Sequence, residues 1–243
     1  MANTDTVKRI VGRIIDNPPA AVLIAGDFLY HPMEEEPGEV RDSRDELERA
    51  DLEEMRSQIA EVVSMLKPLL TAGIPTFAVL GNHDYAMGSA TSRPLPRVAD
   101  ELSASLSAIG IRTLRNFAAP LGSRDAHLTD GARLYVVGLD AWVPGATDIG
   151  AALAHVPAGA PRVLLMHNPT AFLHLPPHSA PVALAAHTHG GQIRLPFTSR
   201  WSWMSLVEEA AVAADGWIAP SFGATGNRLD VNRSIGFRRL PCA

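Results

Sequence analysis

The sequence has almost no cysteine and no long hydrophobic run. Its single cysteine, Cys242, stands beside the C-terminus, which excludes an internal disulfide bond and a zinc site built from several thiolates. No apolar stretch approaches the roughly 20 residues that cross a bilayer, and residues 1–20 lack the pattern of a secretory signal. We therefore expect no membrane segment in this chain and a cytoplasmic location.

Clustered positive charge is also lacking. The chain has 21 Lys and Arg against 26 Asp and Glu, a net charge of −5 at pH 7, and the basic residues are scattered along it. A stable nucleic-acid partner would call for a basic stripe or patch, so we expect a small-molecule partner instead. With 243 residues, 47% of them hydrophobic, the chain can bury one substantial core. We predict a single domain over residues 1–243.

Hydrophobic periodicity predicts an alternation of helices and strands. Helical spacing occurs over residues 4–16, 43–70 and 96–109, and Thr4 is the expected cap of the first helix. Short apolar runs, which are typical of buried strands, occur in six segments: AAVLIAGD, TFAVLGNHDY, IRTLRN, RLYVVGLD, APRVLLMHNP and PVALAAHTHGG. This alternation favours an α/β fold.

Four of these strands run directly into polar side chains. The groups at their ends are Asp27, Asn82-His83-Asp84, His167, and His187-Thr188-His189. Because ligands of open α/β sheets bind beyond the carboxyl ends of the strands, we expect all four groups to converge on one edge of the sheet. In an extended segment His187 and His189 would face the same way, toward a shared cation.

The chemistry of these groups indicates a metal site. Imidazole, carboxylate and amide oxygen without thiolate suit Mn, Fe or Zn. A carboxylate such as Asp27 can bridge two cations, and two-metal sites activate water and stabilise an in-line displacement at phosphorus. Each motif alone is a weak signal, since Asp27 could be a turn residue and GNHD only a polar turn.

The order of the motifs resembles the calcineurin-like metallophosphoesterases, and among them the bacterial phosphodiesterase-like branch. The resemblance is carried by GD at 26–27, GNHD at 81–84, His167 and HTHGGQ at 187–192, and it spans about residues 20–195. It implies a four-layer α/β/β/α sandwich, one or two divalent metal ions per chain with manganese among the candidates, and a small phosphate ester as substrate. Ala186 stands where glycine is usual.

The resemblance also implies the metal ligands. Asp27 would bridge both metal ions. Asn82, His167 and His187 would complete the second metal site, and His189 would bind the first.

The same resemblance assigns catalytic roles. His83 would stand over the leaving group, as general acid or as a positive partner of the phosphoryl oxygens. Asp84 would hydrogen-bond behind it and fix its tautomer. Gly190 and Gly191 would allow a close turn.

One part of the family pattern has no counterpart before residue 20. The family opens with a strand ending in Asp-x-His that supplies two ligands to the first metal, whereas here residues 4–16 read as a helix in which Asp5 is a capping residue. We therefore expect the first strand to be lacking because the sequence begins late. One metal ion would then bind firmly and hydrolysis would be impaired.

A second class of function stays open. A non-catalytic metal-binding or partner-binding scaffold on the same fold also fits the missing first-site ligands, while His83 and Asp84 favour an enzyme. His31, Asp140 and Trp142 could line the cleft, although a turn, cap or packing role explains each. WSWM at 201–204 reads as packing, and FGATGNR at 222–228 reads as a loop between strands.

Overall fold

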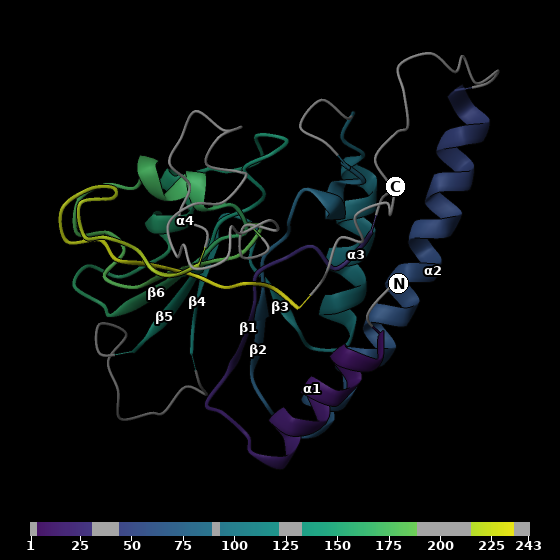
Figure 1. Cartoon of the computed structure of the whole chain (residues 1–243), viewed down its shortest axis with the longest axis horizontal. Coiled ribbons are helices and arrows are strands. Elements are labelled where there is room, and N and C mark those ends of the chain that lie inside the picture. Colours follow the sequence, from purple (N-terminus) through teal and green to yellow (C-terminus); the bar gives the residue numbers. More distant parts are fainter. Residues whose placement is uncertain (1–3, 31–43, 89–92, 122–132, 189–214, 236–243) are drawn as a thin grey trace, which may run out of the picture.

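Two β-sheets with helices beside them form the molecule, and the mixed α/β class is confirmed. The computed structural model describes residues 4–30, 44–88, 93–121, 133–188 and 215–235, with the side chains of 44–51 left out (Figure 1). In the view of Figure 1, helices α1 (Thr4–Asp16), α2 (Arg44–Thr71) and α3 (Pro96–Ala108) stand on one side of the sheets, and α4 (Ile149–Ala154) lies on the other.

The first sheet is parallel and has the order β1-β2-β3. Its strands are β1 (Val22–Ile24), β2 (Thr76–Ala78) and β3 (Arg112–Thr113). The registers pair Val22 with Thr76 and Phe77 with Arg112. The sequence predicted that this strand is buried on both faces. The residues of β1 are only half-buried, because β1 is the edge strand among the described residues.

The second sheet has six described strands in the order β4-β5-β6-β7-β9-β8. Their bounds are β4 (Phe117–Pro120), β5 (Tyr135–Gly138), β6 (Arg162–Leu165), β7 (Ala183–Ala185), β8 (Gly216–Trp217) and β9 (Leu229–Val231). Strands β5, β6, β7 and β9 run parallel, and β4 and β8 pair antiparallel at the two edges.

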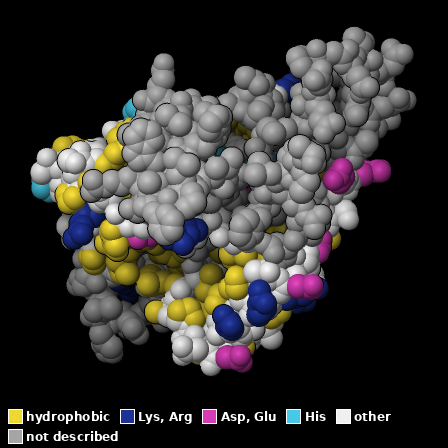
Figure 2. All heavy atoms as spheres, in the orientation of Figure 1, with side chains coloured by type: hydrophobic (Ala, Val, Ile, Leu, Met, Phe, Trp, Pro, Cys, Tyr) yellow, Lys and Arg dark blue, Asp and Glu magenta, His cyan; other side chains and the backbone are white. Residues whose placement is uncertain are grey.

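The helices follow the predicted periodicity closely. They are α1 (Thr4–Asp16), α2 (Arg44–Thr71), α3 (Pro96–Ala108) and the short α4 (Ile149–Ala154), with 3₁₀ turns η1 (His83–Tyr85) and η3 (Pro169–His174). Thr4 is the first helical residue, and its hydroxyl donates to Glu61 Oε1 at 2.8 Å. Thr4, predicted as the cap before the helix, is thus part of α1, and its side chain links α1 to α2. Charged side chains cover the outer face of α1 in Figure 2.

Three hydrophobic clusters show how these layers pack. Along β2 and the two residues after it the side chains alternate: Ala78 and Leu80 pack with the helices α1–α3, while Phe77 and Val79 pack toward the other sheet. The second sheet mirrors this, since Leu165 of β6 packs with Phe77, and Leu164 packs toward α4 and η3. Strands buried on both faces need continuous apolar runs, which explains the sequence pattern. The predicted four-layer order itself stays a prediction.

The structure corrects one expectation about the strand ends. Strands β1 and β2 belong to the first sheet, and β6 and β7 to the second. The polar groups that follow them therefore meet across two packed sheets rather than along one sheet edge. Within the part of the chain that the structure describes, no helix has the length and apolar character that crossing a membrane requires.

Candidate metal centre

Three predicted ligands come together at the carboxyl ends of β1, β6 and β7. The ligand atoms of Asp27, His167 and His187 all lie within 4.8 Å of one another. His167 Nε2 is 3.2 Å from Asp27 Oδ2 and 3.0 Å from His187 Nδ1, and the two imidazole rings meet edge to face. Such a set of imidazole and carboxylate ligands is what a divalent transition metal requires.

The orientation of His167 is fixed by a bond between the two sheets. Its Nδ1 lies 2.7 Å from the carbonyl oxygen of Ala25, which follows β1. Because a carbonyl only accepts, Nδ1 carries a proton, and Nε2 is the ring nitrogen that faces Asp27 and His187. This backbone partner is the arrangement that commonly orients a metal-binding histidine.

Asp27 and His167 shift each other's pKa values. Burial would raise the pKa of Asp27, but the charge and hydrogen bond of His167, with smaller effects of His83 and His187, hold it well below its ordinary value. Burial would lower the pKa of His167, yet Asp27 raises it. A site where acidic and basic groups compete for protons is suited to exchange of protons for a cation.

Asn82 supplies a further oxygen. The side chain is 9% exposed, and its Nδ2 donates to the carbonyl of Met87 at 3.0 Å. Among the described residues, its buried Oδ1 accepts no hydrogen bond. A buried acceptor without a donor costs free energy, so this oxygen fits a cation ligand. The donor set Asp27, Asn82, His167 and His187 therefore fits the divalent metal that the sequence predicts.

Two of these predicted ligands have positive φ angles, which are uncommon outside glycine. Asp27 has φ 56° and His187 has φ 68°, both in the left-handed region. Asp and His are among the residues that tolerate this conformation best, but it is uncommon for any side chain. Strained conformations of this kind gather at functional sites.

Two glycines let the first sheet approach the site. A Cβ atom on Gly81 would collide with Asp27 Oδ1 and would lie 2.8 Å from His167 Cε1. Gly26 has φ +86°, and a Cβ there would lie 2.5 Å from the backbone nitrogen of Gly81. Only residues without a side chain allow the ends of β1 and β2 to lie this close. The sequence analysis did not predict this role.

Asp84 ties together the two loops that follow β1 and β2. It is fully buried, and its carboxylate accepts four backbone N–H groups at 2.8–3.1 Å, from Gly81, Asp27, Phe28 and Leu29. Burial and then the charge of Asp27 raise the pKa of Asp84 to about 7, while the N–H donors of Gly81 and Leu29 act against this. The bonds give Asp84 a positioning role that its place in GNHD did not reveal.

His83 lies beside the ligands. Its backbone N–H donates to Asp27 Oδ1 at 3.1 Å, and its ring is nearly parallel to that of Tyr30, at an interplanar angle of 18° and a centroid distance of 6.3 Å. The predicted hydrogen bond from Asp84 to this ring stays a prediction. His189, Gly190 and Gly191 lie outside the described residues, as do His31 and WSWM at 201–204.

Asp140 belongs to a polar network next to η1 that the sequence did not predict. Its carboxylate accepts from Tyr85 Oη at 2.9 Å and from Arg115 Nε at 2.8 Å. Arg115 also donates to Tyr85 Oη at 2.9 Å and pairs with Asp100. Burial and Asp140 raise the pKa of Tyr85 above its ordinary value. Trp142, the other candidate from this strand end, stacks on His174.

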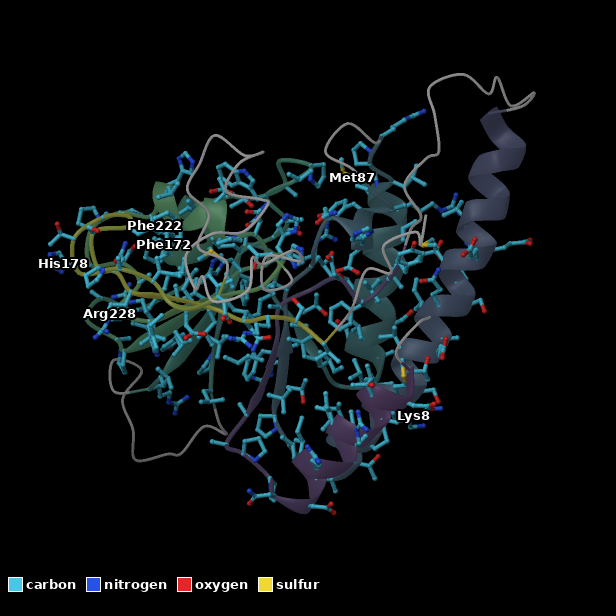
Figure 3. The ribbon with its side chains drawn as sticks, in the orientation of Figure 1. Lys8, Met87, Phe172, His178, Phe222 and Arg228 are labelled. Carbon is cyan, nitrogen blue, oxygen red and sulfur yellow. The ribbon has the colours of Figure 1, made fainter. Side chains whose placement is uncertain are left out.

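The loop 222–228 uses its glycines and arginine for packing. Gly223 lies against the ring of Phe172, which stacks on Phe222, and Gly226 lies against the ring of His178. Arg228 is placed over Trp217 at 5.3 Å. In the view of Figure 3, the labelled side chains of Phe172, His178, Phe222 and Arg228 lie together at one end of the molecule, away from Met87. The loop joins β8 to β9, as predicted.

Known proteins resemble this chain over most of its length. The sequence profile of the calcineurin-like phosphoesterases matches residues 1–191. The uncharacterized metallophosphoesterase YkuE of Bacillus subtilis is 28% identical over 98% of this chain and 68% of its own length. Phosphodiesterase YaeI of Escherichia coli is 26% identical over 75% of this chain and 53% of its own length.

A third relative comes from another bacterial group. UDP-2,3-diacylglucosamine pyrophosphatase LpxG of Chlamydia trachomatis is 29% identical over 69% of this chain and 60% of its own length. The chain thus spans a little over half to two thirds of the lengths of these relatives. The family profile covers well over half of the chain and includes Asp27, Asn82, His167 and His187. This chain therefore belongs to the calcineurin-like phosphoesterase family.

Proposed function

We propose that this chain hydrolyses a phosphodiester or a related small phosphate ester at the site formed by Asp27, Asn82, His167 and His187. The observation that carries the proposal is the convergence of the ligand atoms of Asp27, His167 and His187 within 4.8 Å. The buried Oδ1 of Asn82, which accepts no hydrogen bond among the described residues, supports it. The names of two relatives, a phosphodiesterase and a pyrophosphatase, support esters of this kind.

The four side chains hold one divalent ion firmly in this proposal. A divalent cation bound there supplies Lewis-acid chemistry: it polarises a phosphoryl oxygen and activates water for attack at phosphorus. The bond of His167 Nδ1 to Ala25 would leave Nε2 available as a ligand of the ion. Asp27 would bind it as a carboxylate, since its pKa is held well below its ordinary value. His189 is proposed as a ligand of a second ion.

His83 acts on the leaving group. Its backbone N–H donates to Asp27 Oδ1, which keeps His83 beside the proposed ligands. As an imidazolium it can donate a proton to the departing oxygen, and as a neutral donor it can stabilise the phosphoryl oxygens. Asp84 acts through position, because it holds both loops by their backbone N–H groups.

Hydrolysis of bis-p-nitrophenyl phosphate in the presence of Mn²⁺ tests the proposal. Wild-type protein should release p-nitrophenol, and this release should stop when the metal is chelated. Asn82→Ala and His187→Ala should lower kcat/KM about a hundredfold, because each removes a ligand whose loss misplaces the reacting groups.

A matched histidine variant controls this assay. His155 is exposed and follows α4, so His155→Ala should leave the rate unchanged. Equal rates for His155→Ala and His187→Ala would contradict the proposed site. Absence of metal-dependent hydrolysis by the wild type would favour the non-catalytic scaffold.

A further inference from the structure

We propose that Tyr30 forms an aromatic platform beside the metal centre and selects phosphate esters whose organic group carries a planar ring. The inference rests on the proposed function and deepens it by naming a substrate class. Its starting point is a large aromatic side chain that stands three residues after Asp27 and is nevertheless 54% exposed.

Hydrogen bonds hold the backbone of Tyr30 and of the residues before it. Its N–H donates to Gln58 Oε1 at 2.8 Å, and its carbonyl accepts from Gln58 Nε2 at 2.9 Å. The three residues before it donate their N–H groups to Asp84, and the side chain of Leu29 is buried in the core. Gln58 belongs to α2, so a long helix fixes the point from which the ring projects. The backbone that carries the ring is therefore held in place before any ligand binds.

The rings of Tyr30 and His83 are nearly parallel. The two planes differ by 18°, with 6.3 Å between their centroids, and the backbone of His83 is bonded to the metal ligand Asp27. An organic group that extends from phosphorus past His83 meets the face of Tyr30. Aromatic faces favour flat, polarisable partners in offset stacks, and stacking of this kind tolerates many different planar rings.

Position distinguishes Tyr30 from other exposed aromatic residues. In the described part of the chain, Phe117 and Trp217 also expose large rings, at 46% and 58%. Phe117 lies on β4 against His155, and Trp217 lies on β8 under Arg228. Of these three rings, Tyr30 alone adjoins a residue that is hydrogen-bonded to the ligand set, so a role at the site belongs to Tyr30.

Calorimetric titration with two phosphonates tests the platform. Phenylphosphonate and cyclohexylphosphonate carry rings of similar size, but only the first is planar. Mn²⁺-loaded wild-type protein should bind phenylphosphonate at least about fivefold more tightly, a modest stacking effect. Tyr30→Phe should keep this preference, and Tyr30→Leu should reduce the ratio of the two dissociation constants to about one.

A matched variant and a second ligand pair complete the test. Phe117→Leu removes an exposed ring that also packs on a histidine, and the preference should survive it. Comparing the dissociation constants of adenosine 5′-monophosphate and ribose 5-phosphate tests whether a nucleobase can be the planar ring that Tyr30 contacts. Preference in both pairs supports the platform with a nucleobase as ligand, and preference in the phosphonate pair alone supports it with an aryl ester.

Two results would overturn the inference. Wild-type protein that binds both phosphonates equally has no platform, and a preference that persists in Tyr30→Leu places the ring contact elsewhere. Hydrolysis of bis-p-nitrophenyl phosphate by the same wild-type sample separates this failure from that of the proposed function. Metal-dependent hydrolysis without a ring preference rejects the platform alone, whereas no hydrolysis rejects the proposed function.

Discussion

Gly81 stands where any side chain would displace two proposed metal ligands, Asp27 and His167. Its missing Cβ leaves room for Asp27 Oδ1 and for the ring of His167. We expect Gly81→Ala to lower kcat about a hundredfold, because displacing a catalytic group by about 1 Å has an effect of this size. Steady-state kinetics on bis-p-nitrophenyl phosphate measures it.

Gly12 provides the matched control for this substitution. It lies inside α1, and a Cβ there would meet nothing within 4 Å. Gly12→Ala should leave the activity unchanged and stabilise the fold by up to about 1 kcal/mol, because alanine is the better helix former. If both variants keep the wild-type rate, the close approach of Gly81 to the ligands has no functional meaning.

Asp84 is expected to matter for stability as well as for activity. Asparagine offers one acceptor oxygen in place of two, so Asp84→Asn leaves two of the four backbone N–H groups facing an amide donor. At about 1–3 kcal/mol for each unsatisfied buried group, we expect the free energy of unfolding to fall by about 2–6 kcal/mol. Urea unfolding followed by circular dichroism gives the value.

The capping residue Asp148 serves as the comparison. Its Oδ1 accepts from Ala151 N at 2.9 Å at the start of α4, and asparagine caps helices about as well as aspartate. Asp148→Asn should therefore unfold at nearly the wild-type urea concentration. An equally small effect of Asp84→Asn would mean that its four hydrogen bonds do not stabilise the loops.

At the residue scale, sequence reasoning predicted which side chains converge but not what holds them. Asp27, His167 and His187 were expected to meet because each follows an apolar strand, and they do. Their roles as ligands, and that of Asn82, come from the family resemblance and stay a prediction. The bond of His167 to Ala25 joins positions 142 apart. Nothing in the local pattern marks such a partner, because hydrogen bonds of this kind depend on how the two sheets pack.

At the scale of elements, a polar network joins the two sheets beside the site. Arg115 follows β3 of the first sheet, and Asp140 follows β5 of the second and is only 5% exposed. Removing one partner of a buried ion pair leaves an uncompensated charge. We expect Arg115→Ala to lower the free energy of unfolding by about 3 kcal/mol, as measured by urea unfolding.

An exposed ion pair between helices is the control for Arg115. Arg56 of α2 pairs with Glu101 of α3 at 2.8 Å, with half of the arginine side chain in solvent. Exposed pairs contribute little, so Arg56→Ala should have no measurable effect on unfolding. Equal behaviour of the two arginine variants would show that the network does not stabilise the junction of the sheets.

Long helices and strands with a clear hydrophobic pattern could be predicted from the sequence, and short ones could not. Helices α1, α2 and α3 begin and end within two residues of the predicted bounds, because long amphipathic periods give a strong signal. The sequence analysis did not name α4, β4, β8 or β9 as separate elements. Each has two to six residues and owes its form to pairing with neighbours that the local sequence does not reveal.

The whole molecule explains why one site can draw ligands from distant parts of the chain. The first sheet brings Asp27 and Asn82, the second brings His167 and His187, and the shared cluster around Phe77 and Leu165 packs the sheets face to face. A sequence shows that these strands are buried, but it does not show that they form two sheets. The convergence was predicted correctly and its architecture was not.

Metal binding by the folded protein tests this account most directly. Equilibrium dialysis against Mn²⁺, with metal quantified by mass spectrometry, should show one tightly bound ion per wild-type chain. His167→Ala should bind at least about tenfold more weakly, since loss even of a group that only supports a ligand costs that much, while His155→Ala should bind like the wild type. Circular dichroism confirms that each variant is folded. A folded His167→Ala that retains the wild-type affinity would contradict the account.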